Sequence, residues 1–199
     1  MIEFVVKGIR IKLSFLFFWF FALLLFIDKS GFVLMGFIAA SIHELGHLLA
    51  FVLLNDLPIE LSFEISGIKM VRSQKIIPAW KSLVQLFAGS SLNFIFFFIL
   101  LFSLHSVNRI SVFATCHFML GTFNLLPIRA LDGGKIIQLL LDKIFSPRIS
   151  VLVCTMISWG TLVLLIGICL YFFSVGTGNL SLFSICIWMG IVCCKKESL

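Results

Sequence analysis

The sequence predicts an all-α polytopic membrane protein with six transmembrane helices and one short membrane-associated β-hairpin after the second helix. Three observations predict this fold class. Of the 199 residues, 61% are hydrophobic and only 12% are charged, whereas a soluble domain has about 25% charged residues. Six apolar segments approach the ~20 residues that span a bilayer. No repeat or linker separates them, so residues 1–199 are expected to form a single domain.

The predicted spans follow the apolar segments of the chain. The first segment has a basic start, as a signal peptide does. However, "DKSG" follows it instead of a small-residue cleavage site, so a permanent span is expected. The six spans cover residues 13–27, 31–54, 82–104, 110–127, 149–173 and 179–194.

The basic residues predict how these spans are oriented. With the N-terminus in the cytoplasm, 13 of the 15 Lys and Arg residues fall on the cytoplasmic side, as the positive-inside rule requires. Six spans then place both termini in the cytoplasm of a multi-pass cell-membrane protein. Topology thus explains the net charge of +6, and no nucleic-acid partner is expected. The thirteen residues are Lys7, Arg10, Lys12, Lys69, Arg72, Lys75, Lys81, Arg129, Lys135, Lys143, Arg148, Lys195 and Lys196.

Residues 59–70, between the second and third spans, alternate between apolar and polar side chains. Apolar residues occupy every second position from Ile59 to Ile65, including Phe63, and Glu and Ser occupy the positions between them. This alternation predicts a strand, and the "SG" dipeptide at 66–67 predicts the turn of a hairpin. The alternative is an amphipathic loop on the cytoplasmic face.

The second span contains "SIHELGHLLA" at residues 41–50, with three ionisable residues in an apolar run. One such residue at bilayer depth costs roughly 2.5 to 3.5 kcal/mol, so a functional reason is expected. His43 and His47 are four residues apart and share one helix face, where two imidazoles can bind one Zn²⁺. Glu44 beside them can take a proton from water on that ion. Polar contacts between helices are the alternative.

A hydrolytic zinc site has three protein ligands and one position open to water, so a third ligand must come from elsewhere. Among the carboxylates other than Glu44, Asp132 interrupts apolar sequence, in "FNLLPIRALDGGKII", whereas the rest lie near membrane borders or in polar loops. Pro127 would end the fourth span, and Gly133-Gly134 would allow a sharp turn after Asp132. Residue chemistry leaves two roles equally open, a zinc ligand and a helix cap.

Helix geometry places several polar residues at similar depths in the bilayer. His47 lies about 10 Å from the cytoplasmic end of the second span, and Asn124 in the fourth span lies at a comparable depth. Gly89 and Asn93 of the third span lie roughly 12 to 18 Å deep, and small residues around Gly89 also suit close helix packing. His117 lies about 10 Å outward of Asn124 and is expected to form a hydrogen bond between helices.

These motifs together resemble the site-2 protease family of intramembrane zinc metalloproteases. "HELGH", "AGSSLNF" and "FNLLPIRALDGGK" are similar to its three motifs, in the same order, and the resemblance covers residues 1–194. "NLLPI" with "LDGGK" is most similar to the bacterial sporulation branch, which processes a sigma-factor precursor. That branch usually carries a CBS domain after its last span. This sequence stops at Leu199, so control through a CBS domain is not expected.

The resemblance implies a role for each matching residue. His43, His47 and Asp132 would bind Zn²⁺, and Glu44 would be the general base and later the proton donor. Extended substrate could add as a strand to the predicted β element. The residues expected to bind substrate are Asn124, Pro127, Phe63 and Ile65.

The implied function is hydrolysis of a peptide bond in a membrane-associated protein near the cytoplasmic side, such as a sigma-factor precursor or an anti-sigma factor. The expected partners are that substrate and the lipid bilayer, with a regulatory membrane protein as a further candidate. A membrane zinc transporter and a non-catalytic substrate-binding adaptor are the alternatives. Transport would need a polar path across the bilayer, but the outer half offers His105 and His117 alone. The intact Glu44 argues against an adaptor.

Overall fold

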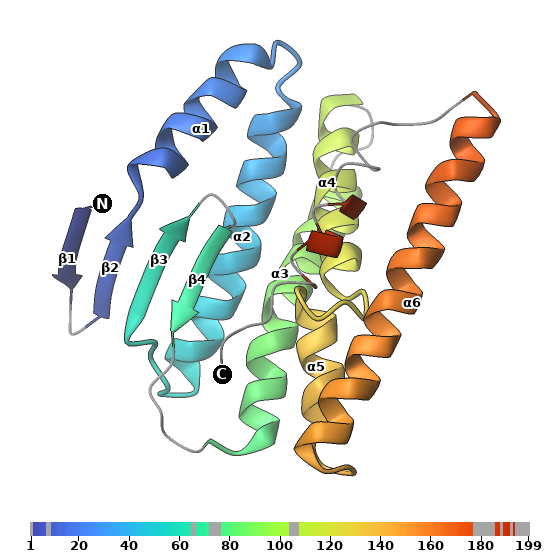
Figure 1. The fold of residues 1–199 in the computed structure, drawn as a ribbon. Helices are drawn as coiled ribbons and strands as arrows, with labels where there is room; N and C mark the ends of the chain where they lie inside the picture. The colour runs from blue at the N-terminus through green and yellow to red at the C-terminus, as the bar shows by residue number, and fades with distance from the viewer. Residues whose placement is uncertain are drawn as a thin grey trace. The chain divides into compact units, whose positions relative to one another are not determined.

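The computed structural model describes most of the chain, and it is mainly helical with one small sheet (Figure 1). The chain divides into two compact units, Met1–Gly121 and Thr122–Leu199, and α4 (Asn108–Asn124) crosses the boundary between them. The single domain expected from the sequence stays a prediction. The described residues are 2–6, 9–64, 67–71, 77–103, 108–176, 186–187, 189–191 and 193.

The first unit contains a four-stranded sheet built from two antiparallel hairpins. β1 (Ile2–Val6) pairs with β2 (Ile9–Leu13), and β3 (Glu60–Glu64) pairs with β4 (Gly67–Val71). β2 and β3 run parallel and join the hairpins in the order β1-β2-β3-β4. The hairpin predicted after the second span is therefore confirmed by β3 and β4.

The N-terminal hairpin is where the structure departs from the prediction. The sequence predicts a span from residue 13, but Leu13 ends β2 and α1 begins at Phe15. The reason is main-chain pairing, because Leu13 lies opposite Phe63 and the Ser14 amide donates to the Phe63 carbonyl at 3.1 Å. The predicted two-stranded hairpin thus becomes half of a four-stranded sheet.

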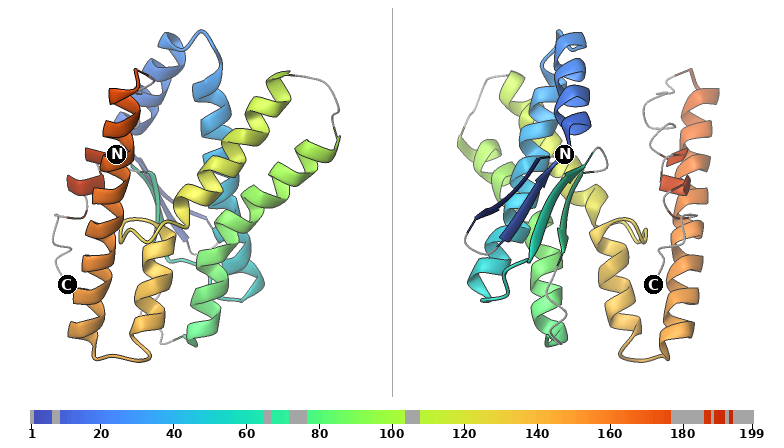
Figure 2. Two further views of the ribbon diagram at one scale, coloured as in Figure 1. Left: turned by 90° about the vertical axis from the view of Figure 1, so that its right-hand side faces the viewer. Right: turned by 60° about the vertical axis from the view of Figure 1, so that its left-hand side comes forward.

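The helices of the first unit are α1 (Phe15–Ile27), α2 (Phe32–Leu53) and α3 (Ala79–Ser103), together with most of α4. α2 and α3 lie side by side in both views of Figure 2. A Cβ atom at Gly46 of α2 would lie 2.6 Å from the Ala88 carbonyl oxygen of α3. Only glycine at this position allows the two backbones to approach so closely.

A tight connection anchored by Asp28 leads from α1 into α2. The Asp28 carboxylate accepts hydrogen bonds from the amides of Ser30 (2.8 Å), Gly31 (3.2 Å) and Val33 (2.7 Å), and from the Ser30 hydroxyl. The hydroxyl of Ser30, followed by the Val33 amide, lowers the pKa of Asp28 below its ordinary value, because these donors stabilise the charged form. This carboxylate therefore fixes the start of α2.

The second unit is built on α5 (Asp132–Leu141) and α6 (Pro147–Ser174). The thiol of Cys154 on α6 lies 3.5 Å from the Gly134 carbonyl oxygen on α5. Buried apolar side chains, including Ile128 and Leu162, form the core of this unit. The loop that leads into α5 is thus packed against α6.

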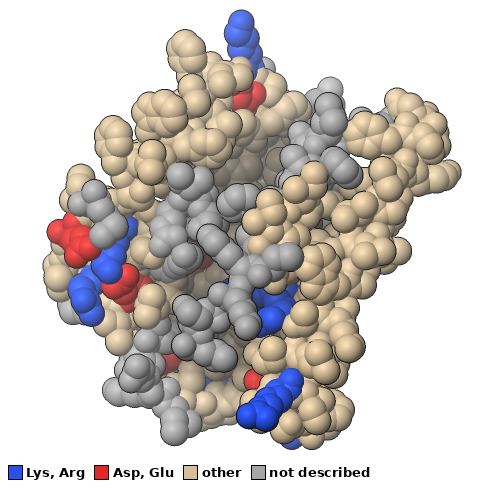
Figure 3. All heavy atoms as spheres, viewed as in Figure 1, with Lys and Arg blue, Asp and Glu red and all other residues tan. Residues whose placement is uncertain are grey.

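Three of the described helices are long and apolar enough to cross a membrane, namely α2, α3 and α6. α1 has 13 apolar residues and α4 has 17 residues, and these five helices coincide with five predicted spans. The span predicted at 179–194 lies largely outside the described residues, so a six-span topology stays a prediction. Figure 3 shows charged side chains gathered over the sheet, whereas mostly uncharged side chains cover the helices.

Candidate metal centre

α2 presents His43 and His47 one turn apart on the same face, as their four-residue spacing predicts. Their Nε2 atoms are 3.1 Å apart, and the two ring planes are nearly perpendicular at 87°. His43 is buried, with 4% of its surface exposed, and His47 is half-buried. Both imidazoles therefore direct one nitrogen toward a common point inside the protein.

The outer nitrogens of the two imidazoles face α3. Nδ1 of His47 donates to the Gln85 carbonyl oxygen at 2.7 Å, and Nδ2 of Asn93 lies 3.5 Å from Nδ1 of His43. A carbonyl oxygen only accepts, so neutral His47 carries its proton on Nδ1, and Nε2 is the nitrogen whose lone pair can bind a metal. Metal-binding histidines are commonly oriented by such outer hydrogen bonds.

Gly89 brings the α3 backbone directly against the two rings. A Cβ atom at this position would lie 2.5 Å from Nε2 of His47 and 2.7 Å from Cε1 of His43. Any side chain at residue 89 would therefore compete for space with the atoms that would bind a metal.

Asp132 is the first residue of α5, and 6% of its surface is exposed. One carboxylate oxygen, Oδ1, accepts a hydrogen bond from Nζ of Lys135 at 3.2 Å. The N-cap residue of α5 is Leu131, which makes no side-chain capping bond. The alternative in which Asp132 is the helix cap is therefore wrong, because Asp132 already lies inside the helix.

The two glycines after Asp132 permit a close approach of backbones, not the sharp turn that the sequence predicts. Both lie in α5 and neither has a positive φ. A Cβ atom at Gly133 would lie 2.2 Å from the Leu125 carbonyl oxygen, and one at Gly134 would lie 2.2 Å from the Ile128 carbonyl oxygen. The incoming loop packs so tightly on the first turn of α5 that no side chain fits there.

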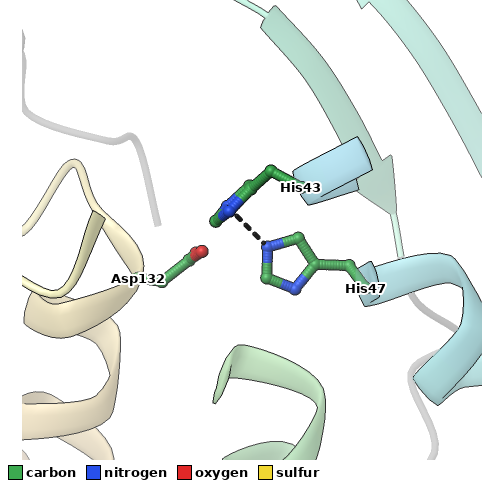
Figure 4. Close-up of side chains that lie close together, drawn as sticks. All are labelled: His43, His47 and Asp132. Carbon is green, nitrogen blue, oxygen red and sulfur yellow. Dashed lines mark hydrogen bonds between the residues drawn. The ribbon is translucent and has the colours of Figure 1, made fainter. Parts of the chain in front are cut away.

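His43, His47 and Asp132 form a possible metal site, with one ligand atom from each residue and all three atoms within 4.8 Å of one another (Figure 4). Two imidazoles and one carboxylate are a ligand set of hydrolytic zinc sites. Tetrahedral zinc with Zn–N bonds of about 2.0 to 2.1 Å places two ligand nitrogens about 3.3 Å apart. The 3.1 Å between the Nε2 atoms is close to that value, so the donors fit zinc.

The predicted catalytic and substrate-binding residues lie on several elements. Glu44 follows His43 on α2 and is half-buried. Asn124 is the last residue of α4, and Pro127 lies in the loop between α4 and α5. α4 thus ends three residues before the proline that the sequence predicts as the end of the fourth span.

Phe63 and Ile65 are the substrate-binding residues predicted on the sheet. Phe63 lies in β3, and its ring packs against Phe17 of α1 with 6.1 Å between the ring centroids. β3 has a strand on each side, so an added substrate strand cannot pair with it. Ile65 lies outside the described residues.

The structure adds Gln85 to the site and gives Asn93 a direct contact with a predicted ligand, whereas the sequence indicates only the depth of Asn93. The sequence signal for both is their spacing, because Gln85, Gly89 and Asn93 are four residues apart and share one face of α3. That face could be recognised only once α2 was known to pack on it.

Comparisons with known proteins match part of the chain to one family model and its whole length to one solved fold. Residues 104–168 match the model of peptidase family M50. A site-2 protease from Methanocaldococcus jannaschii has a similar fold, with a TM-score of 0.70 and 21% sequence identity over 100% of this chain and 95% of that chain. No curated protein matches the sequence significantly. The matched segment contains Asn124 and Asp132, and the shared fold extends over the whole chain.

Proposed function

We propose that this chain is an intramembrane metalloendopeptidase of the site-2 protease type, which cleaves membrane-embedded proteins with one bound zinc ion. His43, His47 and Asp132 would hold the ion. The observation that carries this proposal is the pair of Nε2 atoms 3.1 Å apart, with both outer nitrogens facing α3. The buried carboxylate of Asp132 would supply the third donor.

The proposed chemistry divides between the metal and the side chains beside it. Zinc bound here would polarise the scissile carbonyl and lower the pKa of water toward about 7. Glu44 would accept one proton from the attacking water and deliver it to the leaving amine as the C–N bond breaks. The Asn124 amide would donate a hydrogen bond to the oxygen on which negative charge develops.

The sheet suggests how the substrate is presented. A helical substrate hides its peptide carbonyls, so an extended segment would add to a free strand edge. Among the described residues, β4 has β3 as its one neighbouring strand, so β4 offers such an edge. We therefore propose β4 as the docking strand, in place of the interior strand that contains Phe63.

The sequence motifs support a more specific proposal about the substrate and the topology. The similarity of "NLLPI" and "LDGGK" to the sporulation branch favours a sigma-factor precursor, and an anti-sigma factor is the related option. The distribution of Lys and Arg favours six spans in the cell membrane with both termini in the cytoplasm. A regulatory membrane protein is proposed as a further partner.

The test of this function separates proton transfer from zinc binding. We expect the purified Glu44→Gln variant to keep one zinc per chain but to lose cleavage of a membrane substrate by a factor of at least about 100, because glutamine cannot accept the proton. Zinc is measured by metal analysis and fragments by mass spectrometry, with candidate sigma-factor and anti-sigma precursors as substrates. Cleavage at the wild-type rate would refute the role of Glu44.

The third ligand is tested by Asp132→Asn, which keeps the side-chain shape and removes the negative charge. We expect lower zinc content per chain, whereas Asp142→Asn at the C-terminal end of α5 should leave it unchanged. Unchanged zinc in Asp132→Asn would remove Asp132 from the site. Zinc flux into vesicles without any cleavage would favour the transporter alternative.

A further inference from the structure

A chain of buried polar side chains runs from His43 across α3 to α4. Nδ1 of His117 lies 3.0 Å from Oδ1 of Asn93, and Nδ2 of Asn93 lies 3.5 Å from Nδ1 of His43. His117 and Asn93 are fully buried, and 4% of the His43 surface is exposed. Burying polar groups is costly unless they are paired, so these three side chains depend on one another. All three lie in the first unit.

His117 sits in an aromatic environment that fixes its ring. Phe96 stacks on the imidazole with 5.4 Å between centroids and an angle of 19°, and Phe113 meets it edge-on at 4.7 Å. Nε2 of His117 has no hydrogen-bond partner within the described part of the chain. Among the described residues, this ring therefore makes its polar contact with Asn93, through Nδ1.

The contacts of Asn93 with His117 and His43 are consistent with one arrangement of donors and acceptors. An amide oxygen only accepts, so His117 carries its proton on Nδ1, and the NH₂ group of Asn93 faces Nδ1 of His43. Nδ1 of His43 is then an acceptor, and the His43 proton lies on Nε2. Nε2 of His43 lies 3.1 Å from Nε2 of His47, which can accept that proton in a hydrogen bond.

A metal ion requires the opposite tautomer of His43. Nε2 must present its lone pair to the metal, so the proton moves to Nδ1 and needs an acceptor. A rotation of the Asn93 amide by 180° would supply Oδ1 as that acceptor and turn its NH₂ group toward His117. His117 would then accept at Nδ1 and hold its proton on Nε2. No net charge changes in this rearrangement.

We infer that Asn93 and His117 are positioning residues of the metal centre, which together hold His43 in the tautomer that binds the ion. The inference rests on the proposed zinc site and adds two residues that do not touch the metal. The fixed ring of His117 holds the Asn93 amide, and the amide in turn sets the proton of His43.

The first test measures the zinc dissociation constant of the full chain in detergent by competition with a chelating dye. Loss of an outer-shell partner typically weakens metal binding about 10- to 100-fold, so Asn93→Leu should raise Kd by such a factor. His117→Phe keeps the aromatic volume and should raise Kd about tenfold, at the lower end of that range. His117→Gln should restore near-wild-type Kd, because its amide can either donate to or accept from Asn93.

Ser90→Ala is the matched control, because Ser90 is also buried on α3 and its hydroxyl has no partner among the described residues. Its Kd should equal that of the wild type. If Asn93→Leu fails to fold, the pair His117→Phe and His117→Gln carries the test. Equal Kd values in wild type and His117→Phe would overturn the inference, as would failure of His117→Gln to restore binding.

The second test observes the tautomer directly by ¹⁵N NMR of histidine-labelled protein. Zinc should move the His117 proton from Nδ1 to Nε2, and a His117 spectrum unchanged by zinc would overturn the inference. A wild-type chain that binds no zinc, or whose zinc binding survives His43→Ala, would instead refute the proposed function. The two failures are therefore distinguishable.

Discussion

Gly89 determines how close α3 comes to the two imidazoles. The nearest atom to a Cβ at this position is Nε2 of His47, at 2.5 Å, which is the atom proposed to bind zinc. Both rings are backed by α3, through the Gln85 carbonyl on one side and Asn93 on the other. The imidazoles therefore cannot retreat from an added methyl group without losing these contacts.

We predict that Gly89→Ala weakens zinc binding by at least about tenfold, because the methyl group occupies the space between the ligand nitrogens. The zinc dissociation constant and the thermal stability are measured in the same detergent. Gly36→Ala on α2 is the matched control, since nothing lies within 4 Å of a Cβ there. The Gly36→Ala substitution should stabilise α2 by up to about 1 kcal/mol. Equal zinc affinity in both variants would contradict this account of Gly89.

The residue pair His43 and His47 could be predicted from sequence alone, because helical periodicity places positions four apart on one face. Gln85 could not be predicted, because its main-chain carbonyl is the functional group and any residue type supplies one. The sequence indicated that Asn93 is a polar residue inside a predicted span. Its partners could not be predicted, because they lie on α2 and α4, 50 and 24 positions away in the sequence.

At the scale of elements, the loop before α5 is held by α6. The Arg129 amide donates to the Ser158 hydroxyl at 3.0 Å, and the Arg129 guanidinium donates to the Thr155 hydroxyl at 3.0 Å. Ser158 is fully buried. This loop leads directly to Asp132, so α6 determines where the first turn of α5 begins.

We predict that Ser158→Ala destabilises the protein by about 1 to 3 kcal/mol, because it leaves the Arg129 amide without its acceptor. It should also weaken zinc binding through Asp132. Thermal unfolding and zinc titration measure the two effects. Thr161→Ala, which removes a hydroxyl bonded within α6 to the Ile157 carbonyl, is the control and should be near neutral. Identical behaviour of the two variants would show that the loop is held by other contacts.

The connection between α1 and α2 predicts a pH dependence. The folded state lowers the pKa of Asp28 below 3.8, so its stabilising effect is fully present above the unfolded pKa and is lost as pH falls through the lower folded pKa. Asp28→Ala should therefore lower the melting temperature at pH 7, and the difference from the wild type should vanish at strongly acidic pH. Lys29→Ala is the control, with no acid-dependent difference expected. A difference that persists at low pH would refute this role of the charged carboxylate.

At the scale of the whole molecule, the distribution of Lys and Arg predicts the orientation in the membrane. The connection that contains Lys29 is predicted outside, and the connection that contains Arg148 is predicted inside. We expect Lys29→Cys, with the six native cysteines replaced, to react with an impermeant maleimide in intact cells. Arg148→Cys should react only after permeabilisation. The reverse pattern would place the metal centre on the other side.

The sequence by itself determined the apolar helices and the histidine pair, and it predicted the orientation from the basic residues, because each of these depends on composition or on a period of a few residues. Only the tertiary structure decided that residues 2–6 and 9–13 join the sheet, that Gly133 and Gly134 serve backbone packing, and that Asn93 links His43 to His117. Each of these features depends on contacts between distant positions. Such contacts leave no local period in the sequence, so they emerge only when the helices and strands pack.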